Sequence, residues 1–173
     1  MDEKNIPRIT LSILLIIGML ISLFLLYEHF SASASRFCTF GQSFNCGIVN
    51  KSPYANVDGI SYLLTIDYGL PIPLINISDT NIFLDFITAN AFLGFIILLF
   101  LFFLNKRYKK SHLLWVDKES NRTWIKRVLT FGLIYALYLL YIQHFILRTY
   151  CLFCLLLDIT IIASLITAYK IKN

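Results

Sequence analysis

Charged residues are scarce in this sequence. Aspartate, glutamate, lysine and arginine make up 14% of its 173 residues, whereas a soluble domain averages about a quarter. Hydrophobic residues make up 58%, and the mean hydropathy is +0.72. This balance excludes an ordinary soluble domain with a charged surface and indicates a membrane protein.

Glycine and proline are also few, at seven and four residues, and the sequence has no internal repeat and no low-complexity linker. Two of the prolines, Pro71 and Pro73, interrupt an apolar stretch over residues 60–77. Proline lacks an N–H donor, and lipid requires the backbone groups of a spanning helix to be bonded within the protein. We therefore exclude this stretch as a span and expect a short amphipathic helix and a turn on the membrane face.

Long hydrophobic runs, by contrast, are present. About 20 mostly apolar residues cross a hydrocarbon core of roughly 30 Å, and the stretches that qualify are residues 9–27, 86–104, 128–147 and 149–169. The sequence therefore predicts an all-α integral membrane protein. We expect a bundle of four transmembrane helices that forms a single domain over residues 1–173.

The distribution of lysine and arginine predicts the orientation of the bundle. Loops rich in these residues stay on the cytoplasmic side, and 12 of the 15 lie near the two termini or in residues 105–127. We therefore expect both termini and the loop 105–127 in the cytoplasm, and segments 28–85 and 148–150 outside. Topology and lipid headgroups explain the basic loop. It lacks a binding motif for nucleic acid, so no such partner is expected.

All four cysteines fall on the expected outer side, where disulfides form and persist. Cys151 and Cys154 form a C-x-x-C pair at the start of the last span, and residues three apart share one helix face. A helix N-terminus stabilises a thiolate, which is the attacking species in disulfide exchange. The pair therefore favours redox chemistry over its alternative, two free cysteines that pack as small hydrophobic side chains.

Cys38 and Cys46 flank a polar segment that contains Gly41 and is expected to be flexible. A flexible, exposed disulfide suits electron shuttling, but this pair alone fits a static disulfide that braces the loop equally well. The C-x-x-C on the same membrane face favours shuttling between the two pairs. Four cysteines also bind zinc, yet more than 100 residues separate the pairs. That spacing is unusual for zinc, and we expect no metal.

The order of these motifs resembles the vitamin K epoxide reductase family. The matching features are Cys38-x7-Cys46, Ser52-Pro53-Tyr54-Ala55 with Gly59-Ile60, and Cys151-x-x-Cys154 opening the last helix. The resemblance covers about residues 38–154. In the disulfide-bond formation protein B family, which does similar chemistry, the C-x-x-C precedes the looser pair, whereas here it follows.

The resemblance implies an electron relay from a thiol protein to a quinone. A thioredoxin-like partner would reduce the Cys38–Cys46 disulfide, and Cys46 would then exchange with Cys151. Cys154 would face a quinone of the menaquinone, ubiquinone or phylloquinone type. The implied fold holds this quinone near the outer face of a four-helix bundle, under a short half-helix for which residues 53–65 are the candidate.

The resemblance also implies a cellular setting. Some relatives carry a fused thioredoxin-like domain, whereas this chain stops at Asn173, just after the fourth span. We therefore expect a homologue of bacterial or archaeal type whose thiol partner is a separate protein. Its place would be the prokaryotic cytoplasmic (inner) membrane, with the cysteines on the extracytoplasmic side. There it would support disulfide formation in exported proteins.

Three further residues are candidates for quinone contacts. The animal enzymes have a quinone-contacting tyrosine four residues after the second C-x-x-C cysteine, where this chain has Asp158, so quinone reduction is implied rather than epoxide reduction. Asp158 would exchange a proton with the quinone, or alternatively bond to Gln143 or His144. The family's quinone-contacting asparagine is matched to Asn81. Ser52 matches a hydroxyl near the cysteines, and its alternative is a helix N-cap.

Two functions of other classes stay open. The first is a non-catalytic membrane subunit or small-molecule carrier whose outer disulfides only brace a loop. The second is a transporter, which needs broken helices or several polar groups at mid-membrane, and here Asp158 and Asn90 offer them. Redox lability separates these functions from an oxidoreductase, because structural disulfides resist mild thiols and catalytic ones do not.

Overall fold

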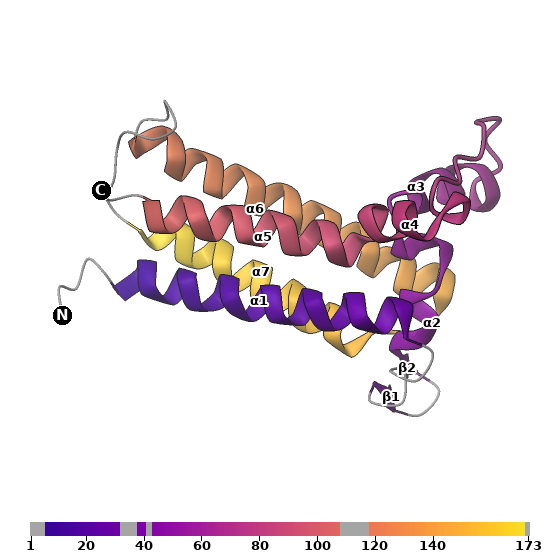
Figure 1. Cartoon of the computed structure of the whole chain (residues 1–173), viewed down its shortest axis with the longest axis horizontal. Coiled ribbons are helices and arrows are strands. Elements are labelled where there is room, and N and C mark those ends of the chain that lie inside the picture. Colours follow the sequence, from indigo (N-terminus) through magenta and orange to yellow (C-terminus); the bar gives the residue numbers. More distant parts are fainter. Residues whose placement is uncertain (1–5, 32–37, 41–42, 108–117, 172–173) are drawn as a thin grey trace.

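The computed structural model describes residues 6–31, 38–40, 43–107 and 118–171. Within them, the four long helices are α1 (Ile6–Phe30), α5 (Asn90–Arg107), α6 (Lys118–Tyr141) and α7 (Leu152–Lys170). These helices lie side by side along the length of the molecule (Figure 1). The start of α1 and the end of α7 share one end of the bundle, and the short elements gather at the other, hereafter the cysteine end.

The long helices are apolar on the outside as well as the inside. Within the described residues, three helical stretches are long and apolar enough to cross a membrane, namely Ile6–Phe30, Asn121–Leu147 and Leu152–Lys170. Asn90–Lys106 is a shorter apolar helix. Large side chains such as Leu20, which is 62% exposed, face outward. A helix that is hydrophobic all round suits lipid, and the expected all-α membrane protein is confirmed.

The expected helix over residues 86–104 is divided in the structure. A short helix, α4 (Ile82–Thr88), is followed by Ala89, whose ψ of 127° is not helical, and α5 starts at the next residue. Ala89 pairs with Asn56 in an antiparallel bridge, and the Val57 N–H donates to the Thr88 carbonyl at 3.1 Å. The prediction of one continuous helix is wrong here because backbone groups at the break bond to a distant segment.

The last two long helices also differ from the expected bounds. α6 begins at Lys118, well before residue 128, and continues into a π-helical segment, η6 (Ile142–Leu147). α7 begins at Leu152 rather than residue 149. The delay has a local cause, because Arg148 adopts a left-handed conformation with φ of 50° and Cys151 is the extended N-cap.

The half of the bundle away from the cysteines has an apolar core. α1 packs against α5 and α7, and α7 packs against α6. Leu11, Leu15 and Leu101 are at most 1% exposed within this core. The helices approach closely at Gly18, where an added Cβ would lie 2.9 Å from the Leu98 side chain. Small side chains at such contacts allow tight helix packing in membranes.

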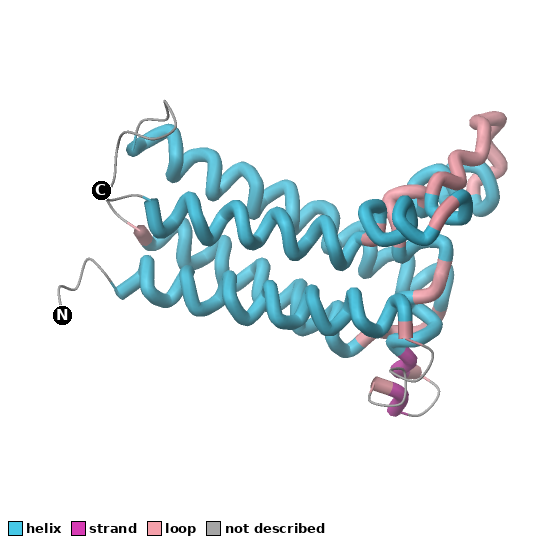
Figure 2. Tube along the Cα trace, viewed as in Figure 1, coloured by secondary structure: helices cyan, strands magenta, loops and turns pink. Residues whose placement is uncertain are grey.

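The cysteine end is built from short elements. Strands β1 (Thr39–Phe40) and β2 (Phe44–Asn45) form an antiparallel hairpin. The elements that follow are α2 (Cys46–Asn50), η3 (Pro53–Ala55), α3 (Gly59–Tyr62), η4 (Leu63–Asp67) and η5 (Ser78–Thr80). Figure 2 shows a loop that projects from this end of the bundle between these helical turns.

The expected short helix within residues 60–77 corresponds to α3 and η4, and the residues after Tyr68 form loop. Gly59 sets the turn that precedes this helix, because an added Cβ would lie 2.6 Å from the backbone Cα of Tyr54. Only glycine fits such a contact without moving the backbone. Gly59 therefore fixes the position of α3 against η3.

Candidate redox site

The hairpin is fastened to the segment that precedes α7. The Tyr150 N–H donates to the Ser43 carbonyl at 2.9 Å, and the Asn45 N–H donates to the Tyr150 carbonyl at 3.0 Å. Phe44 and Tyr150 thus pair in parallel. These bonds place the residue after β2, Cys46, beside the residue after Tyr150, which is Cys151.

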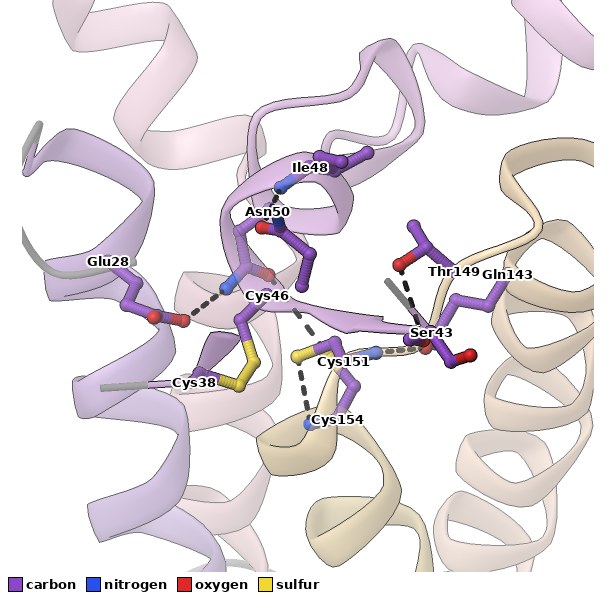
Figure 3. The surroundings of a disulfide bond; sticks show 11 residues. Glu28, Cys38, Ser43, Cys46, Ile48, Asn50, Gln143, Thr149, Cys151 and Cys154 are labelled. Carbon is purple, nitrogen blue, oxygen red and sulfur yellow. Dashed lines mark hydrogen bonds between the residues drawn. A yellow bond between two sulfur atoms is a disulfide. The ribbon is translucent and has the colours of Figure 1, made fainter. Parts of the chain in front are cut away.

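Three cysteine sulfurs meet at this junction. Cys38 and Cys46 form a disulfide, and Cys151 and Cys154 are free. The sulfurs of Cys38, Cys46 and Cys151 lie within 4.8 Å of one another, and all three residues are fully buried. Figure 3 shows the disulfide and Cys151 facing each other between α1 and α7. A thiol beside a disulfide is the arrangement that exchange requires, and two sulfurs joined in a disulfide are not thiolate ligands for a metal.

Cys151 is held by two hydrogen bonds. Its Sγ accepts the N–H of Cys154 at 3.2 Å and thereby caps α7, and its own N–H donates to Gln143 Oε1 at 2.8 Å. The Cys151 sulfur thus pairs with one of the N–H groups at the helix N-terminus that would otherwise lack a partner. The sequence suggested Gln143 only as a partner of Asp158. Its bond to Cys151 forms because the chain turns at Arg148 and brings residue 151 back toward residue 143.

Cys154 faces a second polar group. Its Sγ donates to Asn50 Oδ1 at 3.9 Å, and Asn50 Nδ2 donates to Glu28 Oε2 at 2.9 Å (Figure 3). Glu28 is 1% exposed, and its Oε1 has no partner among the described residues. Sequence reasoning missed both Asn50 and Glu28. The available signal was a carboxylate at the end of an apolar run, which served only to mark the end of the span.

A cavity adjoins the free pair. Of the four cysteines, all of them within the described residues, only Cys154 lines it. The walls are mostly apolar side chains, including Leu25, Ala91, Leu139, Leu147 and Leu157. The polar groups that line it include Asn50, Ser52, Asn90 and Asp158. An apolar cavity with a few convergent polar groups is typical of a small-molecule site.

The candidate residues Ser52 and Asp158 both line this cavity. The Ser52 hydroxyl donates to the Val49 carbonyl at 2.7 Å and makes no cap bond to η3. Ser52 is thus the N-cap residue of η3, as its alternative role predicted, but its side chain makes no cap bond. The alternative partners of Asp158 bond elsewhere, because His144 Nδ1 pairs with the Tyr150 hydroxyl at 2.6 Å and Gln143 bonds to Cys151.

Asn81 lies away from the cavity. It is exposed and caps α4, where its Oδ1 accepts the Phe83 N–H at 3.1 Å. The asparagine that reaches the cavity is Asn90, the first residue of α5. Its Nδ2 donates to the Tyr54 carbonyl at 2.9 Å, and its Oδ1 accepts from the Tyr135 hydroxyl at 2.7 Å. These bonds fix the amide at the cavity wall.

Tyr54 connects the cavity to the projecting segment. It lines the cavity, and its hydroxyl donates to Asp67 in η4. Burial is the main cause that raises the pKa of Tyr54 well above its usual range, and the hydrogen bond to Asp67 adds to it. Tyr54 therefore stays a neutral donor, which holds η4 close to η3.

One comparison with known proteins gives a match. The family model described as the vitamin K epoxide reductase family matches residues 9–169. The matched region includes both cysteine pairs, the cavity and most of the four long helices. No curated protein sequence matches the chain.

Proposed function

Because this chain belongs to the vitamin K epoxide reductase family, we propose that it passes electrons from a thioredoxin-like protein to a quinone. Members of this family are in general oxidoreductases. One observation carries the proposal: Cys151 lies within 4.8 Å of the Cys38–Cys46 sulfurs, while Cys154, three residues later, lines the cavity. The C-x-x-C pair thus touches the disulfide with one sulfur and the cavity with the other.

The first steps are two disulfide exchanges. The dithiol of the partner reduces the Cys38–Cys46 disulfide and becomes a disulfide itself. The Cys46 thiolate then attacks Cys151 in a Cys151–Cys154 disulfide, and Cys154 leaves as a thiolate. Cys38 attacks the resulting Cys46–Cys151 bond, which restores Cys38–Cys46. The products are an outer disulfide and an inner dithiol, which is the state of the cysteines in this structure.

The cavity residues suit a quinone as the next acceptor. A bound quinone accepts two electrons and two protons and becomes a quinol. Apolar walls such as Leu139 would pack against its ring, and Asn90, whose amide is already oriented, would bond to a ring oxygen. Cys154 would give up the electron pair as it rejoins Cys151, and Asp158 would hold a proton for the quinone.

The remaining parts of the proposal concern the setting. The cysteine end faces outward, because the basic residues of the sequence gather in segments assigned to the other side. The membrane is the prokaryotic cytoplasmic membrane, and the partner acts in trans. With this direction of flow, the chain supplies oxidising equivalents to exported proteins.

An anaerobic assay tests the function. The purified protein in detergent is mixed with a reduced thioredoxin-like protein and a menaquinone or ubiquinone analogue, and the quinone absorbance is followed. We expect loss of absorbance with the wild type and none with Cys154→Ser. The substitution Thr130→Ala, at an exposed residue of α6 far from the cysteines in sequence, is the control and should react as the wild type does.

A contrary result would favour the second function. If several quinones and partners give no turnover and no reduced thioredoxin-like partner reduces the Cys38–Cys46 disulfide, the chain is a non-catalytic membrane protein with a braced loop. The structure offers one observation against this alternative. Cys151 and Cys154 are free thiols rather than a second brace.

A further inference from the structure

A second, polar cavity lies next to the one that Cys154 lines. His29, Lys51, Asn56, Asp79 and Asp85 are among its walls. The two cavities measure about 290 Å³ and about 80 Å³, and roughly 10–15 Å³ of such space holds one water molecule. Both cavities therefore have room for water. His29 lines both cavities, so it lies at the boundary between them.

The hydrogen bonds of His29 place one proton on Nδ1 and a second between Nε2 and Asp85. Nδ1 lies 2.6 Å from the Asn50 carbonyl oxygen, and Nε2 lies 3.0 Å from Asp85 Oδ1. A carbonyl oxygen only accepts, so Nδ1 carries a proton. The contact between Nε2 and the carboxylate then needs a second proton, on either atom. His29 and Asp85 thus share one transferable proton, as imidazolium and carboxylate or as imidazole and carboxylic acid.

The groups around this pair support a shared proton. Asp85 Oδ1 also accepts from Asn56 Nδ2 at 2.8 Å, which holds the carboxylate in place. His29 is only about 10% exposed and Asp85 about 26%. On the remaining sides, Glu28 precedes His29 on α1 and is bonded to Asn50. Lys51 is the cationic side chain that lines the polar cavity among the described residues.

The relay itself creates a need for protons. Exchange proceeds through thiolates, so the partner sheds its two protons to the solvent while its electrons pass inward. Cys38, Cys46 and Cys151 are fully buried, so no water reaches the junction by way of these sulfurs. Two electrons without protons would leave two negative charges in an apolar cavity, which is costly. Protons must therefore reach the cavity by another route.

We propose that Asp85 and His29 conduct protons from the polar cavity to the quinone cavity. This inference rests on the proposed function. In each transfer Nε2 of the His29 imidazolium gives its proton to the quinone cavity while Nδ1 keeps its proton on the Asn50 carbonyl. Water in the polar cavity protonates Asp85, and Asp85 passes this proton back to Nε2. Exchange leaves the inner pair as two thiolates, so two such transfers, taken up by the inner sulfurs or by the quinone, supply the two protons of the quinol as Cys151 and Cys154 rejoin in a disulfide. The partner releases two protons at the cysteine end and the quinone takes up two from that end.

The central test is the pH dependence of quinone reduction by pre-reduced protein. Asp85→Asn keeps the size of the side chain but not its proton. We expect a rate roughly 10–100-fold lower, in the range of a lost acid–base group, and falling as pH rises. A small diffusible acid such as imidazole should restore the rate, and Asp85→Glu should be near wild type. Asp79→Asn is the control, because Asp79 lines the same cavity but bonds to Asn76.

A second measurement separates the proton route from folding and from electron transfer. Partner oxidation by the Cys38–Cys46 disulfide, measured without quinone, should be unchanged in Asp85→Asn. If the wild type reduces quinone and Asp85→Asn does so at the same rate and pH profile, the route is overturned and the proposed function stands. If the wild type reduces no quinone, both fall. If Asp85→Asn misfolds, it will lose partner oxidation too. His29→Gln would then replace it in the test, and we expect slower quinone reduction with unchanged partner oxidation.

Sidedness gives an independent check. In vesicles that expose the cysteine end outward, an indicator trapped inside should report no pH change during turnover. An alkaline shift inside would show that the protons come from the opposite end, and would contradict the route through Asp85.

Discussion

The two halves of the bundle use buried side chains differently. Away from the cysteines, the core is a cluster of apolar residues such as Leu15 and Leu101, and among the described residues the buried amide of Asn105 bonds only to neighbouring helix groups there. At the cysteine end, Glu28, Asn50 and Gln143 are at most 9% exposed, and Asn50 and Gln143 bond directly to Cys154 and Cys151. Buried polar groups are costly unless bonded. The difference therefore separates a half that holds the helices together from a half that holds the sulfurs in place, and substitutions in the two should act differently.

The largest effect on turnover should come from Cys46→Ser. Without Cys46 the partner has no disulfide to reduce, so we expect steady-state turnover to fall by more than about 1000-fold. The inner pair is intact, so chemically reduced protein should still reduce one equivalent of quinone in a single turnover. Stopped-flow absorbance measures both. Cys154→Ser should lose the single turnover as well, and equal losses in the two variants would contradict separate roles for the pairs.

Asp158→Asn should have the next largest effect. Asp158 lines the cavity from within α7, and loss of a proton donor there should slow quinone reduction by about 100-fold with little change in thermal unfolding. The matched control is Ser164→Ala, which removes a polar group from the same helix but not from the cavity wall. A single-turnover rate for Asp158→Asn equal to that of the control would remove Asp158 from the chemistry.

Gly59→Ala should weaken quinone binding rather than slow the reaction at saturating quinone. The added Cβ would meet the Tyr54 backbone at 2.6 Å, and Tyr54 lines the cavity. We expect KM for quinone to rise by about tenfold, which corresponds to about 1.4 kcal/mol, while the rate at saturation changes little. Gly132→Ala is the control, because its Cβ would meet only the Ile161 side chain at 3.9 Å. An unchanged KM would show that η3 does not shape the quinone site.

Leu15→Ala should change turnover least. Leu15 is fully buried in the apolar half, so a cavity there should cost about 2–5 kcal/mol of stability. The rate per folded molecule should stay at the wild-type value, because Leu15 itself lines no part of the cavity, although Leu157, which does, packs against the same apolar core. Thermal unfolding in detergent measures the first quantity and active-site titration the second. A lower rate per folded molecule would show that the two halves are coupled.

Much of the fold was predictable because hydrophobic runs are local signals. The apolar length of α1 and α7 and the N-terminal place of the C-x-x-C were both evident from the sequence. The break at Ala89 was not, since no proline or glycine marks it and its cause is pairing with Asn56, 33 positions earlier. Tertiary backbone contacts of this kind leave no pattern in one sequence.

The site was predictable in its sulfurs but not in their surroundings. The spacing of the cysteines carried the redox hypothesis, and the structure brings three of the four sulfurs together. Asn81 was matched by its place near the second span, yet Asn90 reaches the cavity, whereas α4, which Asn81 caps, contributes no residue to the lining. The contact between His29 and Asp85 joins residues 56 positions apart, which is beyond any periodicity.

The burial of the Cys38–Cys46 disulfide has a consequence for selectivity. Both residues are fully enclosed, so a small thiol in solution collides with the surface of the protein and not with a sulfur. Only a protein that displaces part of this cover would reach the bond, and it must recognise the chain to do so. An exposed disulfide would let any passing thiol discharge its electrons into the membrane. In the proposed relay, this cover would therefore restrict electron entry to proteins that recognise the chain.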